Sequence, residues 1–499
     1  MKNDQIGKLP LLEKIGYGFS DASANFVFQI MVMFQVGFYT DVFGITAAAA
    51  GTLLLVGRFW DAIFDPIMGS LADRTNTRWG KFRPWLLWTA VPFALMFFLT
   101  FYTPNFSPSG KLVYAYLTYI LLMTVYSMNN TPYSALNGVM TGDVNERTSL
   151  SSWRFIFAQS ATILVQGFLL LMVASLGRGN AQAGWARSIG LLSVLCIVFF
   201  IITFLSVKER IKPNPEQKAS LKEDISGLAK NGPWLAMFGL TLFVFITLAL
   251  WGSAMYYYFN YFISKAHLFT FLQWLGMAAT PAADGSLVLS GGQKILDAMG
   301  LLAKPDLSNT AIIGFSLFNM IGTILSLIGI VLSKRLTIRF SKKSVFMTGL
   351  LLTVLFTALF FVLSPTAIGA TFVLNILKSL AYSFTIPLLW AMMADVADYS
   401  EWKTARRSTG FIFAGIVFAL KAGLGFGGAI CGWLLSLYGY VPNAAQNSHA
   451  LFGIKMTASI YPAITFAIGA VALSFYSISK KLSLQIQDEL VERRKSYQY

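Results

Sequence analysis

The sequence predicts an all-α membrane protein with twelve transmembrane helices in two six-helix bundles, and three observations support this fold class. Of the 499 residues, 56% are hydrophobic and only 12% are charged, whereas soluble domains carry about 25% charged residues. Apolar runs of about 18 or more residues, each long enough to cross the hydrocarbon core of a bilayer as a helix, recur along the whole chain. The longest charged interval, 208–233, divides these runs six and six.

The expected spans are the apolar stretches that lie between charged turns or turns marked by Pro and Gly. They cover residues 18–40, 47–72, 84–103, 112–137, 150–175, 187–207, 234–262, 309–332, 344–363, 367–394, 409–437 and 453–479. We therefore expect an N-terminal bundle over 1–207, a central cytoplasmic loop over 208–233, a C-terminal bundle over 234–479 and a cytoplasmic tail over 480–499. An outward insertion at 263–308 contains two stretches too short to span, and it is either a lid over the outer vestibule or an inert insertion.

The net charge of +16 reflects 38 Lys and Arg against 22 Asp and Glu. Most of these cations fall in the two tails and in alternate loops, which is typical of cytoplasmic segments. We therefore expect a multi-pass protein of a bacterial inner membrane with both termini in the cytoplasm. The positive charge is explained by topology, so we expect the lipid bilayer as a partner, but neither nucleic acid nor an obligatory protein.

The second span carries the most informative charged residues, Arg58, Asp61 and Asp65. A charged side chain at the centre of a spanning helix costs about 2.5–3.5 kcal/mol on insertion scales. Asp61 and Asp65 are four residues apart and share one helix face, and two carboxylates this close resist joint ionisation unless a cation or a proton joins them. The spacing predicts a cation-coupling site; the alternative is a structural salt-bridge cluster between helices.

Further polar residues in the spans predict a cavity near the membrane midplane, where hydroxyl-rich solutes find donors and acceptors. These candidate substrate-binding residues are Asp21, Asn25, Asn130, Ser134, Arg154 and Lys421, together with Ser127 beside the carboxylates. For a single member, hydrogen bonding between helices is an equal alternative. The chain has only two histidines, which are isolated, so we expect neither an enzyme nor a bound cofactor.

Six plus six helices around a basic central loop is the outline of a major facilitator transporter. Three motifs then carry a resemblance: RFWDAIFDPIMG at 58–69, RWGKFRPW at 78–85 and ADVADYSEW at 394–402. They resemble the glycoside-pentoside-hexuronide:cation symporters, the family of the melibiose carrier. The resemblance runs from about Gly16 to the last span, without the insertion. It implies symport of a sugar with Na+, Li+ or H+ by alternating access.

The resemblance also implies roles for individual residues. It places the cation at Asp61 and Asp65 beside Ser127, with Asn130 able to complete a site for Na+; if the ion is Na+, Asp61 and Asp65 are metal ligands. It assigns Arg154 and Lys421 to the substrate cavity. The residues that look like inner-gate charges are Asp73, Arg78, Asp395, Asp398 and Arg407.

Four positions depart from the melibiose carrier, and one of them is Ala24, which replaces a lysine. Asn25 and Asn130 replace aspartates of its sugar pocket, which makes a plain galactoside a poor substrate and favours an acidic sugar beside Arg154. Phe64 replaces a polar residue, and because hard cations prefer oxygen ligands this favours H+, although Na+ stays open. A transporter of lysolipids or other amphiphiles on the same scaffold is the alternative function.

Overall fold

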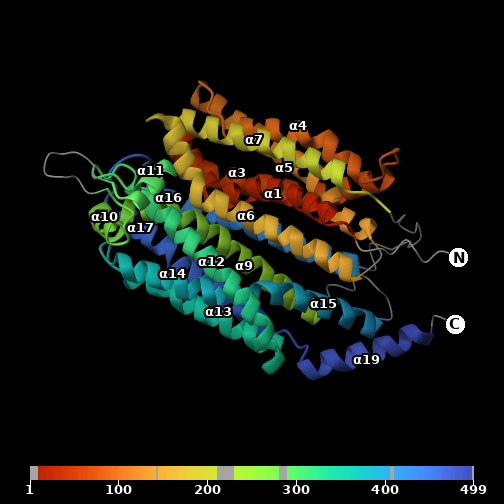
Figure 1. Cartoon of the computed structure of the whole chain (residues 1–499). Coiled ribbons are helices and arrows are strands. Elements are labelled where there is room, and N and C mark those ends of the chain that lie inside the picture. Colours follow the sequence, from red (N-terminus) through yellow and green to blue (C-terminus); the bar gives the residue numbers. More distant parts are fainter. Residues whose placement is uncertain (1–8, 142–143, 211–229, 280–288, 405–408, 497–499) are drawn as a thin grey trace. The chain divides into compact units, whose positions relative to one another are not determined.

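The structure is a computed structural model that describes residues 9–141, 144–210, 230–279, 289–404 and 409–496. Across these ranges the chain is helical, and β-structure is limited to two isolated bridges. Eleven helices are long and apolar enough to cross a membrane, and a twelfth span results if the bent pair Leu11–Met33 and Gln35–Phe43 counts as one. The described chain therefore confirms the predicted all-α fold (Figure 1).

The helices of the N-terminal half follow the expected spans within a few residues. They are α1 (Leu11–Met33), α2 (Gln35–Gly37), the π-helical η1 (Phe38–Phe43), α3 (Ala47–Arg74), α4 (Arg83–Thr100), α5 (Pro108–Met140), α6 (Val144–Gly177) and α7 (Ala181–Ser206). Several begin where the sequence offers a cap: the side chains of Thr46, Ser107 and Asn180 each accept a hydrogen bond from a backbone N–H of the first turn. Such caps satisfy donors that a helix end leaves without an internal partner.

The C-terminal half contains the remaining spans and several short helices. They are α9 (Gly232–Tyr257), η2 (Tyr258–Phe262), α10 (Lys265–Trp274), α11 (Gly291–Ala298), α12 (Thr310–Arg339), α13 (Lys342–Leu359), η3 (Phe360–Val362), α14 (Ile368–Ser383), α15 (Thr385–Thr404), α16 (Thr409–Leu437), α17 (Ser448–Ala458), α18 (Ile460–Ser474) and α19 (Lys480–Ser496). Helices α10 and α11 fall in the insertion, and both are too short to cross a bilayer.

The chain divides into two compact units. The first comprises Met1–Glu216, Leu268–Leu317 and Gly439–Ala445, and the second Gln217–His267, Phe318–Tyr438 and Gln446–Tyr499. Most of the insertion thus groups with the first unit, although it interrupts the C-terminal half of the sequence.

In the first unit, α1 packs against α6 and α7, while α5 packs against α3 and α4. The contact between α3 and α5 depends on Gly57, because a Cβ atom there would overlap the ring of Tyr119. Small residues let helix backbones approach closely inside a membrane. This close approach positions the polar side chains of α3 opposite those of α5.

In the second unit, α9 packs against α16 and α18, and α13 packs against α14 and α18. Gly423 and Gly427 of α16 lie directly on the backbone of α9, where a Cβ atom would meet the carbonyl oxygens of Leu242 and Ile246. The glycine-rich segment of α16 therefore serves helix packing.

Candidate cation and substrate site

Two carboxylates and one hydroxyl form the centre of the candidate cation site, between α3 and α5 of the first unit. The Ser127 hydroxyl of α5 lies 2.6 Å from Asp61 Oδ1 and 2.7 Å from Asp65 Oδ1. Asp61 is fully buried, Ser127 is buried and Asp65 is half-buried. The structure thus brings Asp61, Asp65 and Ser127 together as the sequence and the resemblance predicted, although their roles in transport stay a prediction.

The hydroxyl proton of Ser127 cannot serve both carboxylates at once, because a serine has a single O–H donor. Arg58, which is also buried, approaches Asp61, with 4.0 Å between Nη1 and Oδ2. Thr131 Oγ1 lies 3.3 Å from Asp65 Oδ1. The cluster therefore brings two acids to one hydroxyl, and two carboxylates this close in a low dielectric favour binding of a small cation or a proton.

The chemistry of the donor set is compatible with either ion. Two carboxylates and neighbouring hydroxyls offer the oxygen ligands that hard cations prefer, and a proton shared by two carboxylates relieves their repulsion equally well. Asn130, one turn after Ser127 on α5, is half-buried and makes no hydrogen bond within the described part of the chain. Across the described residues, no group of three or more His, Cys, Asp or Glu side chains forms a metal cluster.

A second charged pair joins α1 to α6. Arg154 Nε donates to Asp21 Oδ1 at 2.9 Å, and the Asp21 side chain is 7% exposed whereas that of Arg154 is 34% exposed. The guanidinium lies over the ring of Tyr133, 5.3 Å from its centroid, and Tyr133 stacks on Tyr17. Arg154 is thus held by a carboxylate and by the face of an aromatic ring, and its side chain stays partly exposed.

The remaining predicted substrate residues differ in their surroundings. Asn25 donates to the backbone oxygen of Asp21 at 2.8 Å and lies 3.4 Å from its Oδ2, so it supports the pair from the next turn of α1. Ser134 is exposed on α5. Lys421 belongs to α16 of the second unit, where it is half-buried.

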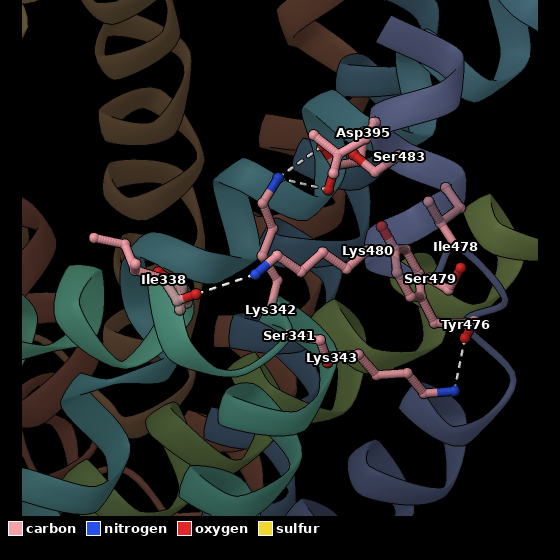
Figure 2. Close-up of a pocket in the computed structure, with 12 residues that line it drawn as sticks. Ile338, Ser341, Lys342, Lys343, Asp395, Tyr476, Ile478, Ser479, Lys480 and Ser483 are labelled. Carbon is pink, nitrogen blue, oxygen red and sulfur yellow. Dashed lines mark hydrogen bonds and ion pairs between the residues drawn. The ribbon is translucent and has the colours of Figure 1, made fainter.

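The predicted gate residues divide between the two units. In the second unit, Lys342 Nζ lies 2.8 Å from both carboxylate oxygens of Asp395, which ties the start of α13 to α15 (Figure 2). Asp398 is half-buried on α15. In the first unit, Asp73 and Arg78 are exposed. Arg407 lies outside the described residues, and a gating role for any of the five stays a prediction.

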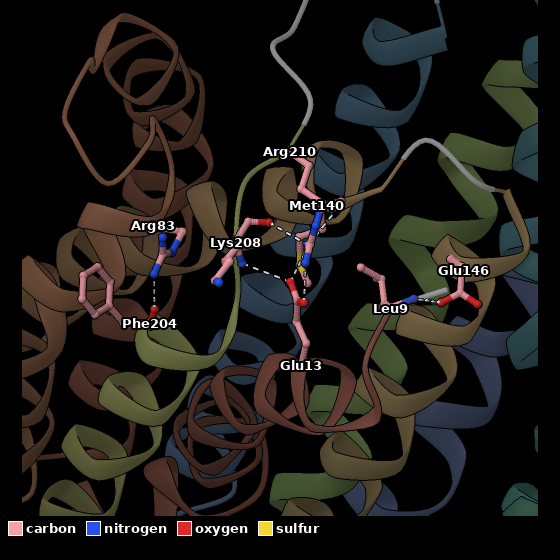
Figure 3. Close-up of polar contacts among 8 residues, drawn as sticks. All are labelled: Leu9, Glu13, Arg83, Met140, Glu146, Phe204, Lys208 and Arg210. Atoms are coloured by element: carbon pink, nitrogen blue, oxygen red, sulfur yellow. Dashed lines mark hydrogen bonds and ion pairs between the residues drawn. The ribbon is translucent and has the colours of Figure 1, made fainter. Parts of the chain in front are cut away.

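One polar network in the first unit was not anticipated from the sequence. Glu13 of α1 binds Arg210, with 2.7 Å between Oε1 and Nη1, and also accepts from the backbone N–H of Lys208 (Figure 3). Glu146 of α6 accepts from the backbone N–H of Leu9 and pairs with Lys14. The network joins the segment after α7 to α1 and α6. Glu13 and Arg210 lie about 200 positions apart in the sequence, so no local pattern reveals that they pair.

A buried lysine in the second unit lies inside a span but was given no role from the sequence. Lys378 of α14 is 8% exposed and its Nζ lies 2.7 Å from the ring centroid of Trp251. It makes no ion pair with an acidic side chain in the described part of the chain. The signal that could have identified it was present, because a lysine in the middle of an apolar span is costly and rare.

Comparison with known proteins identifies one family, and the similar proteins are transporters. A family model described as MFS/sugar transport protein matches residues 13–289 and 310–480. The inner membrane symporter YicJ of Escherichia coli (strain K12) is 35% identical over 98% of this chain and 97% of its own length. The isoprimeverose transporter of Lactiplantibacillus pentosus is 30% identical over 95% of this chain and 90% of its own.

Solved structures agree on the fold. A bacterial homologue of the human lysosomal transporter Spinster, in an inward-facing and unoccupied conformation, is similar with a TM-score of 0.62. The match covers 96% of this chain and 99% of that one at 13% identity. At such low identity the likeness extends to the helical architecture alone.

Proposed function

Because the chain belongs to the MFS/sugar transport protein family, we propose that it is a symporter that takes up a glycoside, pentoside or hexuronide together with H+ or Na+ by alternating access. Transport across a membrane is the activity of the family. Beyond the family's activity, we propose the coupling ion and the substrate class. We also propose that both termini lie in the cytoplasm, because Lys and Arg are concentrated in the tails and alternate loops.

The observation that carries the proposal is the hydroxyl of Ser127 between Asp61 and Asp65, at 2.6 and 2.7 Å. Two acids that meet at one hydroxyl resist joint ionisation unless a cation or a proton joins them. In a buried position this favours a positively charged ligand that binds and leaves.

In this proposal, cation binding is coupled to sugar transport because two carboxylates buried close together are unfavourable unless a cation or a proton joins them. With the cation bound, the pair is neutralised and α3 can keep its place against α5 during the conformational change. The bound cation also completes the sugar pocket, and the carrier moves easily between outward and inward forms only when it is fully loaded or fully empty. One charge driven by about 150 mV supplies roughly 3.5 kcal/mol, enough for a few-hundred-fold accumulation of sugar.

We assign the sugar to the surroundings of Arg154. The side chain of Arg154 is partly exposed, and Asp21 and Tyr133 fix its orientation. Sugars offer hydroxyl acceptors, and hexuronides add a carboxylate that matches a guanidinium in geometry and charge. Half-buried Asn130 lies one turn from Ser127, which makes it the natural link between substrate and cation.

Isotope uptake in membrane vesicles tests the proposal directly. A panel of glycosides, pentosides and uronides is offered while a Na+ gradient and a pH gradient are imposed separately. We expect one ion gradient to drive accumulation of one of these sugars, and Asp61→Cys to abolish the accumulation. Uptake against a gradient that survives in Asp61→Cys contradicts the coupling assignment, and lysolipid movement without sugar uptake identifies the amphiphile transporter instead.

A further inference from the structure

A cavity of about 280 Å³ lies within the second unit, apart from the carboxylate cluster and the arginine pair. It is formed where α12 ends, where α13 begins, and where the chain passes from α18 into α19 (Figure 2). Three lysines line it, Lys342, Lys343 and Lys480, and one carboxylate, Asp395. The lining charges therefore favour an anion as the occupant.

Two helix N-termini converge on this cavity. Ser341 caps α13 by accepting from the backbone N–H of Ser344, and Ser479 caps α19 in the same way for Leu482. Both serines line the cavity. A single cap satisfies only one of the four N–H groups that a helix start leaves without an internal partner. Two positive helix ends with spare donors are a favourable setting for a phosphate group.

The lysine side chains are held in place by groups of the protein. Lys343 Nζ donates to the backbone oxygens of Ser474 and Tyr476 at 2.8 and 2.7 Å, and Lys480 Nζ donates to that of Ile338 at 3.0 Å. An ammonium has three donors, so each of these two lysines keeps at least one for a ligand. Because these lysine side chains are already ordered, a ligand does not incur the entropy cost of ordering them when it binds.

Tyr476 adds an independent observation. Its side chain is 2% exposed and lines the cavity, yet its hydroxyl finds no hydrogen-bond partner among the described residues. Burial, with a smaller contribution from the negative charge of Asp395, raises the pKa of this phenol, so it stays a neutral donor. Buried polar groups without a partner are uncommon, and a bound acceptor would satisfy this one.

Apolar side chains flank the same cavity. Ile338, at the end of α12, is 69% exposed, and Leu484, on the first turn of α19, is 55% exposed. Both line the cavity. A lysine cluster next to exposed aliphatic side chains at the end of membrane-spanning helices matches the boundary between lipid headgroups and acyl chains.

We propose that this cavity is a binding site for a phosphate group, contributed by the headgroup of an anionic phospholipid that docks between the N-termini of α13 and α19. Lys343 and Lys480 contact the phosphate, Ile338 and Leu484 contact the start of the acyl chains, and the Lys342–Asp395 pair forms one wall. The bound lipid would thereby tie α19 to α12 and α13. The site is separate from the transported sugar and from the coupling cation.

The proposal is tested on the purified full-length protein, delipidated in detergent and titrated with phosphatidylglycerol or with phosphatidylcholine while bound lipid is counted by native mass spectrometry. We expect phosphatidylglycerol to bind more tightly, and Lys343→Gln with Lys480→Gln to weaken it roughly tenfold or more. Lys480→Gln alone has a matched control in Lys481→Gln, which removes one charge from an exposed neighbour that does not line the cavity. If the double variant fails to fold, Lys480→Gln alone provides the test.

A second arm separates the lipid from a soluble source. Thermal unfolding is followed with inorganic phosphate in place of lipid, at constant ionic strength. Stabilisation by phosphate that depends on Lys343 and Lys480, without preference for phosphatidylglycerol, keeps the phosphate site but assigns it to a soluble ligand. Equal phosphatidylglycerol binding by wild type and the lysine variants, or equal weakening by Lys481→Gln, overturns the proposal.

Discussion

The first unit contains two charged clusters that differ in their balance. Asp21 and Arg154 form a one-to-one pair with 2.9 Å between Oδ1 and Nε. Asp61 and Asp65 share a serine hydroxyl, and Arg58 Nη1 lies 4.0 Å from Asp61 Oδ2. The first cluster joins one acid to one cation, and the second joins two acids through one hydroxyl. Burial of charge alone therefore does not point to a coupling site, whereas two like charges held together do.

Removing the arginine of the balanced pair should give the largest effect. Arg154→Gln leaves Asp21 buried without its cation, and we expect a loss of about 3–5 kcal/mol in stability. Thermal unfolding in detergent measures it. Asp21→Asn combined with Arg154→Gln should recover most of the stability without recovering substrate binding. A double variant no more stable than Arg154→Gln would contradict the interpretation of a balanced pair.

Neutralising one acid of the Asp61–Asp65 cluster should act on transport instead of on folding. In Asp61→Asn we expect sugar accumulation to fall from a few-hundred-fold to about onefold, because the driving ion is no longer coupled. Exchange of labelled for unlabelled sugar should persist, since it needs no net movement of the ion. The measurement is vesicle uptake with and without a gradient. Loss of exchange together with accumulation would point to a structural role for Asp61.

The shared hydroxyl should have an intermediate effect. Ser127→Ala removes a charge-assisted hydrogen bond, and we expect the half-saturating cation concentration for uptake to rise about tenfold. Thr124→Val is the control, because Thr124 lies on the same helix but accepts from Trp60 and does not contact the carboxylates. Equal responses of the two variants would show that a hydroxyl on α5 matters only for packing.

The smallest effect is expected at Thr131, whose Oγ1 lies 3.3 Å from Asp65 Oδ1. At this distance the hydrogen bond is weak, so Thr131→Val should shift the cation dependence by roughly two- to threefold. Cation titrations of uptake in the same vesicles resolve a change of this size. A shift as large as that of Ser127→Ala would mean that Thr131 takes a direct part in the site.

Much of the architecture was open to prediction because it depends on local properties of the chain. A run of about 20 apolar residues defines a span wherever it occurs, so the twelve expected spans match the eleven helices and the bent pair of the described chain. The shared face of Asp61 and Asp65 is local in the same sense, because helix geometry brings residues four apart together. The family resemblance rested on three such local motifs.

Other features are not encoded in any short stretch. Arg154 pairs with Asp21, which lies 133 positions away in the sequence. The π-helical segment after α2 and the cavity at α13 and α19 depend on the packing between helices. Phe64, a departure that favoured H+, packs against the apolar core of the first unit, which its residue type alone did not reveal.

By itself, the sequence determined which segments enter the bilayer and which of them carry charge, because hydropathy and helical period act within one segment. The tertiary structure decided which charged side chains meet, because this depends on the rotation and the register of helices far apart in the chain. Contacts such as that of Gly57 with Tyr119 fix the rotation and the register of the helices. Both depend on packing between helices, which no local sequence pattern reveals.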